Sequence, residues 1–251
     1  MTDHASGRGF SIGSVLSRGF SIYFSNLMSF LPLSLIAYVP IWAAILVLGG
    51  TAAAGPEAIS GGFGIMMLAG LVAGYWLQAA LVYGTIATMR GNAPGMGETF
   101  TRSLAALGGV LILGIVMTII IGLGTLLFIV PGIILSVMFF VAIPAAVVER
   151  GGVGASLTRS RELTAGHRWQ LFALVLILVV LMIVIGMVVG IALGVGGMAA
   201  AADGGGAAIW IQQLFNMVIG GIWATIIAVA YHDLRIAKEG GDTEQIARSF
   251  D

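Results

Sequence analysis

A run of 45 residues without a charged side chain, from Leu104 to Val148, constrains the fold of this chain more than any other feature. A single helix of that length would measure about 68 Å at 1.5 Å per residue. The hydrocarbon core of a bilayer is only about 30 Å thick, so the run must fold back on itself. Pro131-Gly132 is the strong helix-breaking pair near its middle, and we expect a membrane hairpin to turn there.

The composition places the whole chain in the membrane class. Hydrophobic residues make up 59% of it and charged residues 9%, against about 45–50% and about 25% in soluble domains. We therefore expect an all-α polytopic membrane protein. The formal net charge is zero, which predicts no bulk attraction to nucleic acid. The chain has no cysteine, which excludes thiolate metal sites and cysteine nucleophiles.

The apolar runs predict six transmembrane helices arranged as three hairpins, each preceded by a cytoplasmic amphipathic surface helix. The membrane domain covers residues 12–239, between a disordered N-terminus (1–11) and a cytoplasmic tail (240–251). The spans are expected at about residues 27–49, 63–89, 104–128, 132–148, 169–195 and 207–230. Pro144 should bend the fourth span. Glycines four residues apart predict close helix packing at Gly70, Gly74, Gly186, Gly190 and Gly194.

The distribution of basic residues predicts the orientation. The polar segment from Glu149 to Trp169 lies between two apolar spans and contains four of the eleven Arg and Lys residues. With six spans, all eleven fall on one side of the membrane, and the loops on the other side carry only Glu57 and Asp203. The positive-inside rule therefore predicts a multi-pass protein whose N- and C-termini are both cytoplasmic.

A short motif recurs before each odd-numbered span. The pattern Gly-x-x-[Leu/Phe]-[Ser/Thr]-Arg occurs at residues 13–18, 97–102 and 154–159. A parallel repeat of one surface helix and one hairpin, used three times, would explain it. Alternatively, surface helices before membrane spans simply look alike. The first of these helices, expected at residues 12–25, suits either the membrane surface or packing on the bundle.

Charged side chains of the third surface helix and of the end of the sixth span are expected at one membrane level. This predicted ionic cluster comprises Arg159, Arg161, Glu162, Arg168, Asp233 and Arg235. Paired, it would clamp the tail to the polar segment; unpaired, it would be a set of independent solvated charges. No charged residue lies inside the spans, which argues against a charge-coupled pump or a buried proton relay. Gln78, the most polar residue at mid-depth, either makes an interhelical hydrogen bond or lines a substrate path.

Motifs for catalysis are missing from the sequence. It has no HExxH zinc motif, no phosphate-binding loop and no GxSxG nucleophile elbow. His167 and His232 lie near carboxylates on the cytoplasmic side, and ordinary surface hydrogen bonding accounts for them. We therefore expect no catalytic residue, no cofactor and no metal site.

Four segments carry a family resemblance: FSIGSVLSRGFSIYFSN, IVPGIIL, IPAAVVERGGVGASLTRSRELTAGHRWQLF and YHDLRIAKEGGDTEQIA. They resemble the bacterial membrane-domain family named after glycerophosphoryl diester phosphodiesterases, which is Yip-like in character. Its most specific pieces here are Pro144, Glu149, Ser160, Leu163, Thr164, Gly166, Trp169, Tyr231, Asp233, Leu234 and Arg235. The resemblance implies a six-helix domain in a bacterial inner membrane. The phosphodiesterase barrel found in some members is not in this sequence, so its activity is not expected.

The expected function is that of a non-enzymatic integral inner-membrane protein. It would act as an assembly, regulatory or lipid-interacting partner through its cytoplasmic face. Its expected partners are membrane lipids and a membrane or cytoplasmic protein, with no nucleic acid. The alternative is a small-molecule or lipid transporter or channel built from three hairpins. A polar cavity that reaches Gln78 would favour transport, and a dry, tightly packed bundle would favour the first hypothesis.

Overall fold

The structure is a computed structural model that describes residues 10–49, 56–91, 94–200 and 206–248. Every element in this part of the chain is an α-helix. The helices are α1 (Ile12–Ser25), α2 (Leu27–Gly49), α3 (Pro56–Met89), α4 (Met96–Leu127), α5 (Ile129–Met138), α6 (Ala142–Glu149), α7 (Gly152–Thr164), α8 (Arg168–Ala200) and α9 (Gly206–Arg248).

Six stretches are long and apolar enough to cross a bilayer. They are Leu27–Leu46, Met67–Met89, Met96–Leu127, Ile129–Glu149, Arg168–Ile191 and Trp210–Gly240. The chain is a multi-pass helical membrane protein, as the hydropathy predicts. The fourth stretch is not one helix, because it combines α5 and α6 with a break between them.

The turn between α4 and α5 lies at Phe128, three residues before the predicted Pro131-Gly132. A proline ring clashes with the carbonyl four residues earlier, and four residues before Pro131 is Leu127, the last residue of α4. The proline therefore occupies the first turn of α5, where its missing N–H costs nothing. Gly132 then lets the hairpin close, because a Cβ there would lie 2.9 Å from the Thr125 Cα.

Pro144 does more than bend the fourth span. The same clash falls on Phe140, and the helix is interrupted at Phe139–Val141 before α6 begins. Neither α5, with 10 residues, nor α6, with 8, spans a bilayer alone. The prediction of one bent helix at 132–148 is therefore wrong in this detail.

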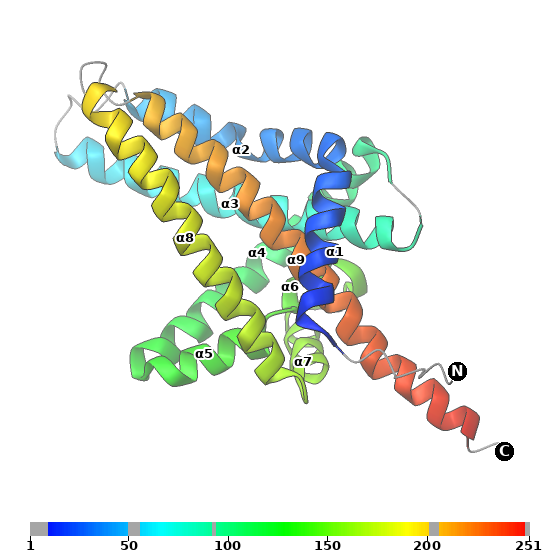
Figure 1. Ribbon diagram of the computed structural model, residues 1–251. Helices are drawn as coiled ribbons and strands as arrows, with labels where there is room; N and C mark the ends of the chain where they lie inside the picture. Colours follow the sequence, from blue (N-terminus) through cyan, green and yellow to red (C-terminus); the bar gives the residue numbers. More distant parts are fainter. Residues whose placement is uncertain (1–9, 50–55, 92–93, 201–205, 249–251) are drawn as a thin grey trace.

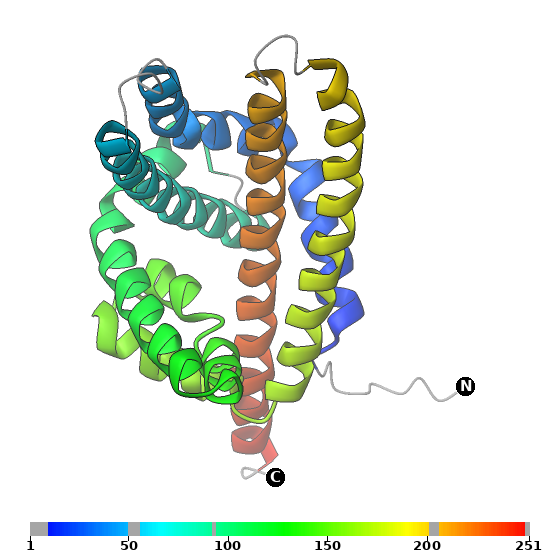
Figure 2. The ribbon, with the colours of Figure 1, turned by 90° about the vertical axis from the view of Figure 1, so that its left-hand side faces the viewer.

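α9 is the central helix of the bundle. It contacts α1, α2, α3, α6, α7 and α8, and its residues 224–231 are all buried. Figure 2 shows α9 between α8 on one side and α3, α4 and α5 on the other. α8 is peripheral, and many of its apolar side chains are exposed. In a bilayer, lipid chains would cover this face.

The helix ends separate into two groups (Figure 1). The C-terminal ends of α2 and α8 and the N-terminal ends of α3 and α9 gather at the upper left, with the α4–α5 turn below them. α1, α7 and the C-terminal end of α9 lie toward the right. Most of the well-buried core lies at the end where α6 and α7 pack.

The first predicted surface helix packs against the bundle. α1 buries Val15, Gly19 and Tyr23, which are spaced four residues apart and form one face. A Cβ at Gly19 would lie 2.6 Å from Ile226 Cγ1, and one at Gly221 would lie 2.5 Å from Tyr23 Cε2. One glycine on each helix thus lets α1 lie directly on α9.

The segment that precedes the third span does not form a separate helix. α4 is continuous from Met96 to Leu127, so the prediction of a distinct surface helix before the third span is wrong. In all three copies, nevertheless, the third motif position and the residue directly after the motif arginine are buried. These residues are Val15 and Gly19, Thr99 and Ser103, and Ser156 and Ser160.

Both predicted ends of the membrane domain need adjustment. Phe10 is buried and packs edge-on against His167 at 5.9 Å, so the segment 1–11 is not disordered throughout; residues 1–9 lie outside the described part. α9 continues as one helix to Arg248, in place of a separate tail from residue 240.

The α1–α9 contact can be tested with two glycines of the same helix. Gly19→Leu should lower the free energy of unfolding by about 1–3 kcal/mol, because the new side chain overlaps Ile226 of α9. Gly13→Leu is the control, since a Cβ there meets nothing within 4 Å. Thermal unfolding in detergent measures both. Equal melting temperatures for the two variants would show that α1 does not pack on α9.

Candidate functional site

A network of hydrogen bonds and ion pairs joins α6, α7 and α9. The Glu149 carboxylate accepts a bond from Arg159 Nε at 2.9 Å and one from the Tyr231 hydroxyl at 2.6 Å. Arg159 also pairs with Glu239, and Arg235 Nε lies 2.7 Å from the same carboxylate. Burial opposes the charge of Arg159, but its bonds to Glu149 and Glu239 outweigh this effect and raise the pKa of the guanidinium.

Ion pairs thus join α7 to α9, but not between the residues for which the sequence predicts pairing. Asp233 does not pair with α7; it pairs with Arg18 of α1, and His232 Nδ1 lies 3.6 Å from its carboxylate. Helix geometry explains the change. Arg235 and Glu239, four residues apart, share one face of α9, whereas Asp233 is two residues from Arg235 and points about 200° away.

Besides Asp233, three members of the predicted ionic cluster take no part in this network. Arg161, Glu162 and Arg168 are exposed and make no ion pair among the described residues. For Arg161 and Glu162 the reason is the orientation of α7, which buries Ser160, Leu163 and Thr164 and turns its other face outward; Arg168 is the first residue of α8.

Two buried hydroxyl groups of α7 donate hydrogen bonds to the backbone at the break between α5 and α6. At the break the Ala142 N–H bonds to the Phe139 carbonyl, so the Met138 carbonyl loses the partner it would have in a continuous helix. Ser160 donates to this carbonyl at 2.9 Å and Thr164 at 3.3 Å. An unpaired backbone group costs several kcal/mol away from water, so α7 stabilises the interruption.

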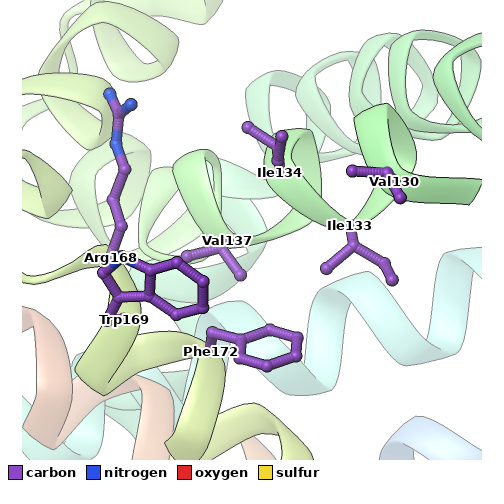
Figure 3. Close-up of a pocket in the computed structure, with 7 residues that line it drawn as sticks. All are labelled: Val130, Ile133, Ile134, Val137, Arg168, Trp169 and Phe172. Carbon is purple, nitrogen blue, oxygen red and sulfur yellow. The ribbon is translucent and has the colours of Figure 1, made fainter.

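A groove of about 450 Å³ lies between α5 and the start of α8. Its lining comprises Val130, Ile133, Ile134, Val137, Arg168, Trp169 and Phe172. Figure 3 shows the rings of Trp169 and Phe172 turned toward the aliphatic side chains of α5, while the Arg168 guanidinium extends away from them. The groove is thus apolar along its length, with a single cation at one end.

A second hollow, of about 340 Å³, lies between α2, α3 and α9. Its lining comprises Tyr38, Gly70, Leu71, Gly74, Tyr75, Leu77, Gln78, Gly220, Trp223 and Ala224. Gln78 thus lines a cavity, and its amide makes no hydrogen bond in the part of the chain that the structure describes. Of the two sequence interpretations for Gln78, the interhelical hydrogen bond is not the one observed.

The glycines expected to mediate close packing do not do so. A Cβ at Gly70 or Gly74 meets nothing within 4 Å, and the same is true of Gly186 and Gly190; the side-chain surroundings of Gly194 lie outside the described part. In α3 these glycines make room for the hollow instead. A four-residue spacing predicts a flat helix face, but whether another helix covers it depends on the tertiary arrangement.

The sequence analysis did not predict a place in the site for Tyr231, Glu239 or Trp169. Tyr231 and Glu239 share a four-residue spacing with Arg235 that could have identified their common face. Trp169, exposed at the end of a span, fits the aromatic belt of membrane proteins. Among the described residues, no group of three or more His, Asp or Glu side chains could hold a metal ion.

Comparisons with protein-family models, curated proteins and solved structures find no match to this chain. The family resemblance therefore stays a prediction from the sequence. Four of the residues that carry it make side-chain hydrogen bonds. Glu149 and Tyr231 do so within the α6–α7–α9 network, and Ser160 and Thr164 bond the Met138 carbonyl.

The support of the broken helix can be tested in α7. A Ser160→Ala, Thr164→Val double variant leaves the Met138 carbonyl without its hydroxyl donors and should lower the free energy of unfolding by about 1–3 kcal/mol. Thr158→Val, on the exposed face of the same helix, should change it little. Denaturant or thermal unfolding reports both values, and a double variant as stable as Thr158→Val would contradict the role given to the hydroxyls.

The Tyr231–Glu149 bond can be tested by a double-mutant cycle. Tyr231→Phe should lower the free energy of unfolding by about 1–3 kcal/mol, since its hydroxyl donates to a carboxylate. The same change should cost less when Glu149→Gln is already present. Tyr38→Phe is the control, because the Tyr38 hydroxyl has no hydrogen-bond partner among the described residues. Strictly additive effects of the two substitutions would show that the bond contributes nothing.

Proposed function

We propose that this chain is a non-enzymatic integral membrane protein that binds membrane lipid through its cytoplasmic face. The observation that carries the proposal is the groove between α5 and α8. An apolar channel with one unpaired guanidinium at its end matches an anionic phospholipid, with an acyl chain along α5 and the headgroup beside Arg168. Trp169 is 84% exposed next to it, and tryptophan favours the headgroup level of a bilayer.

The orientation supports the same assignment. We place α1, α7 and the end of α9 on the cytoplasmic side of a bacterial inner membrane, with both termini there. This proposal rests on the eleven basic residues, which the six spans assign to one side, and on the matching separation of the helix ends (Figure 1). Headgroups on this side of a membrane are partly anionic, which suits Arg168.

We further propose that the spans form three hairpin units. The buried positions shared by the three motif copies support this organisation. In two copies the motif arginine, Arg18 or Arg159, pairs with a carboxylate of α9. The unit would thus have been retained as a way of fixing helices to the central α9.

A protein partner is the second element of the proposal. Arg161 and Glu162 project from the outward face of α7 and engage no described residue, so they are open to an assembly or regulatory partner. The resemblance to the phosphodiesterase membrane-domain family would fit such a role.

The lipid proposal predicts an effect of one charge. Arg168→Gln should weaken binding of phosphatidylglycerol about fivefold, since a cation near an anionic surface contributes about 1 kcal/mol. Ile133→Trp should weaken it as well by filling the groove. Native mass spectrometry of protein from phosphatidylcholine nanodiscs with phosphatidylglycerol as the minor lipid measures the bound fraction.

The control for this measurement is Arg161→Gln, which removes an equally exposed arginine that does not line the groove. It should leave the bound fraction unchanged. If Arg161→Gln and Arg168→Gln reduce binding equally, the contact is general surface electrostatics. If neither has an effect, the groove is not a phospholipid site.

The alternative, a transporter or channel, is favoured by one observation, the hollow that reaches Gln78. Along α3 its lining runs from Gly70 to Gln78, about 12 Å at 1.5 Å per residue. That is less than half of the hydrocarbon thickness of about 30 Å. Transport would therefore require a second conformation that extends this hollow to both sides, and uptake into proteoliposomes would reveal it.

A further inference from the structure

We propose that the hollow between α2, α3 and α9 binds an uncharged quinone-type lipid, meaning a flat ring with carbonyl oxygens and an apolar tail. This inference is independent of the phospholipid groove between α5 and α8, because the two cavities share no lining residue. It assigns the hollow a ligand of stated chemistry and requires no transport.

The position of the hollow selects an uncharged ligand. Tyr38, Gln78 and Trp223 each lie near the middle of a candidate span. No charged side chain lines the hollow, so an ion entering it would lose its hydration without compensation. A molecule that already dissolves in the bilayer pays no such penalty.

The polar groups of the hollow select a hydrogen-bond acceptor. The Gln78 amide and the Tyr38 hydroxyl line the hollow and have no hydrogen-bond partner among the described residues. Unpaired polar groups are costly in a hydrocarbon environment. Carbonyl oxygens would satisfy the Gln78 N–H groups and the Tyr38 hydroxyl, all of which can donate.

The walls of the hollow select a flat ring. Tyr38 and Trp223 supply two aromatic side chains, and aromatic rings stack on flat partners. Gly70 and Gly74 leave the space beside α3 open, since a Cβ on either would meet nothing within 4 Å. The volume of about 340 Å³ lies in the range of small-molecule pockets, roughly 300–1,000 Å³, and accommodates the ring while the tail remains in lipid.

The full chain in phosphatidylcholine nanodiscs should bind decylubiquinone, measured by isothermal titration calorimetry. Decylbenzene, which has a ring and tail but no carbonyl, should bind at least about tenfold more weakly, because the Gln78 amide stays unpaired. Gln78→Leu should remove this preference. No detectable binding of decylubiquinone, or equal binding of the two probes by the unmodified chain, would overturn the proposal.

Filling the hollow provides the second test. Gly74→Leu should abolish binding of decylubiquinone, whereas Gly186→Leu, at an equally open glycine of α8, should retain it. Gly70→Leu replaces Gly74→Leu if the latter fails to fold, as judged by its melting temperature. Binding that survives filling of the hollow would place the quinone elsewhere. Because Arg168→Gln should leave quinone binding unchanged, failure of this proposal is distinguishable from failure of phospholipid binding.

Discussion

The arrangement of the bundle depends on the hydrogen bonds that Ser160 and Thr164 donate to the Met138 carbonyl. A membrane helix can be interrupted only where the freed backbone groups find partners. Here the partners come from α7, so the break between α5 and α6 and the placement of α7 require each other. α7 in turn places Arg159 beside Glu149 and leads through a turn to the start of α8.

That turn shows how local backbone chemistry positions a candidate site. Gly166 has φ 87°, a conformation that favours glycine, and it directs the chain from the buried α7 into α8. Arg168 and Trp169 follow within three residues, and the Trp169 ring faces α5 across the groove. The cavity at the proposed lipid-binding face is therefore a consequence of the same interruption that α7 stabilises, and α9 is fixed to this unit by Tyr231 and Glu239.

Sequence reasoning was most accurate where a single element determines the answer. Hydropathy alone predicted six spans, since the cost of burying charge in hydrocarbon applies to each segment independently of the others. The helix-breaking residues were less accurate guides. The Pro131-Gly132 pair placed the α4–α5 turn three residues too late, and the break before Pro144 was predicted only as a bend. In both cases the proline clashes with the carbonyl four residues earlier, so the helix ends before the breaker itself.

The pairing of side chains could not be predicted from the sequence in the same way. Asp233 and Arg235 differ by two positions, yet Asp233 pairs with Arg18 of α1, whereas Arg235 shares a face of α9 with Glu239, the partner of Arg159 in α7. Likewise, the spacing of Gly70 and Gly74 predicts close packing of another helix, but the two glycines border a hollow. The sequence by itself determined the class, the number of spans and the segregation of charge, which follow from the transfer of side chains to lipid. Only the tertiary structure decided which faces meet, because helix orientation depends on contacts between distant segments.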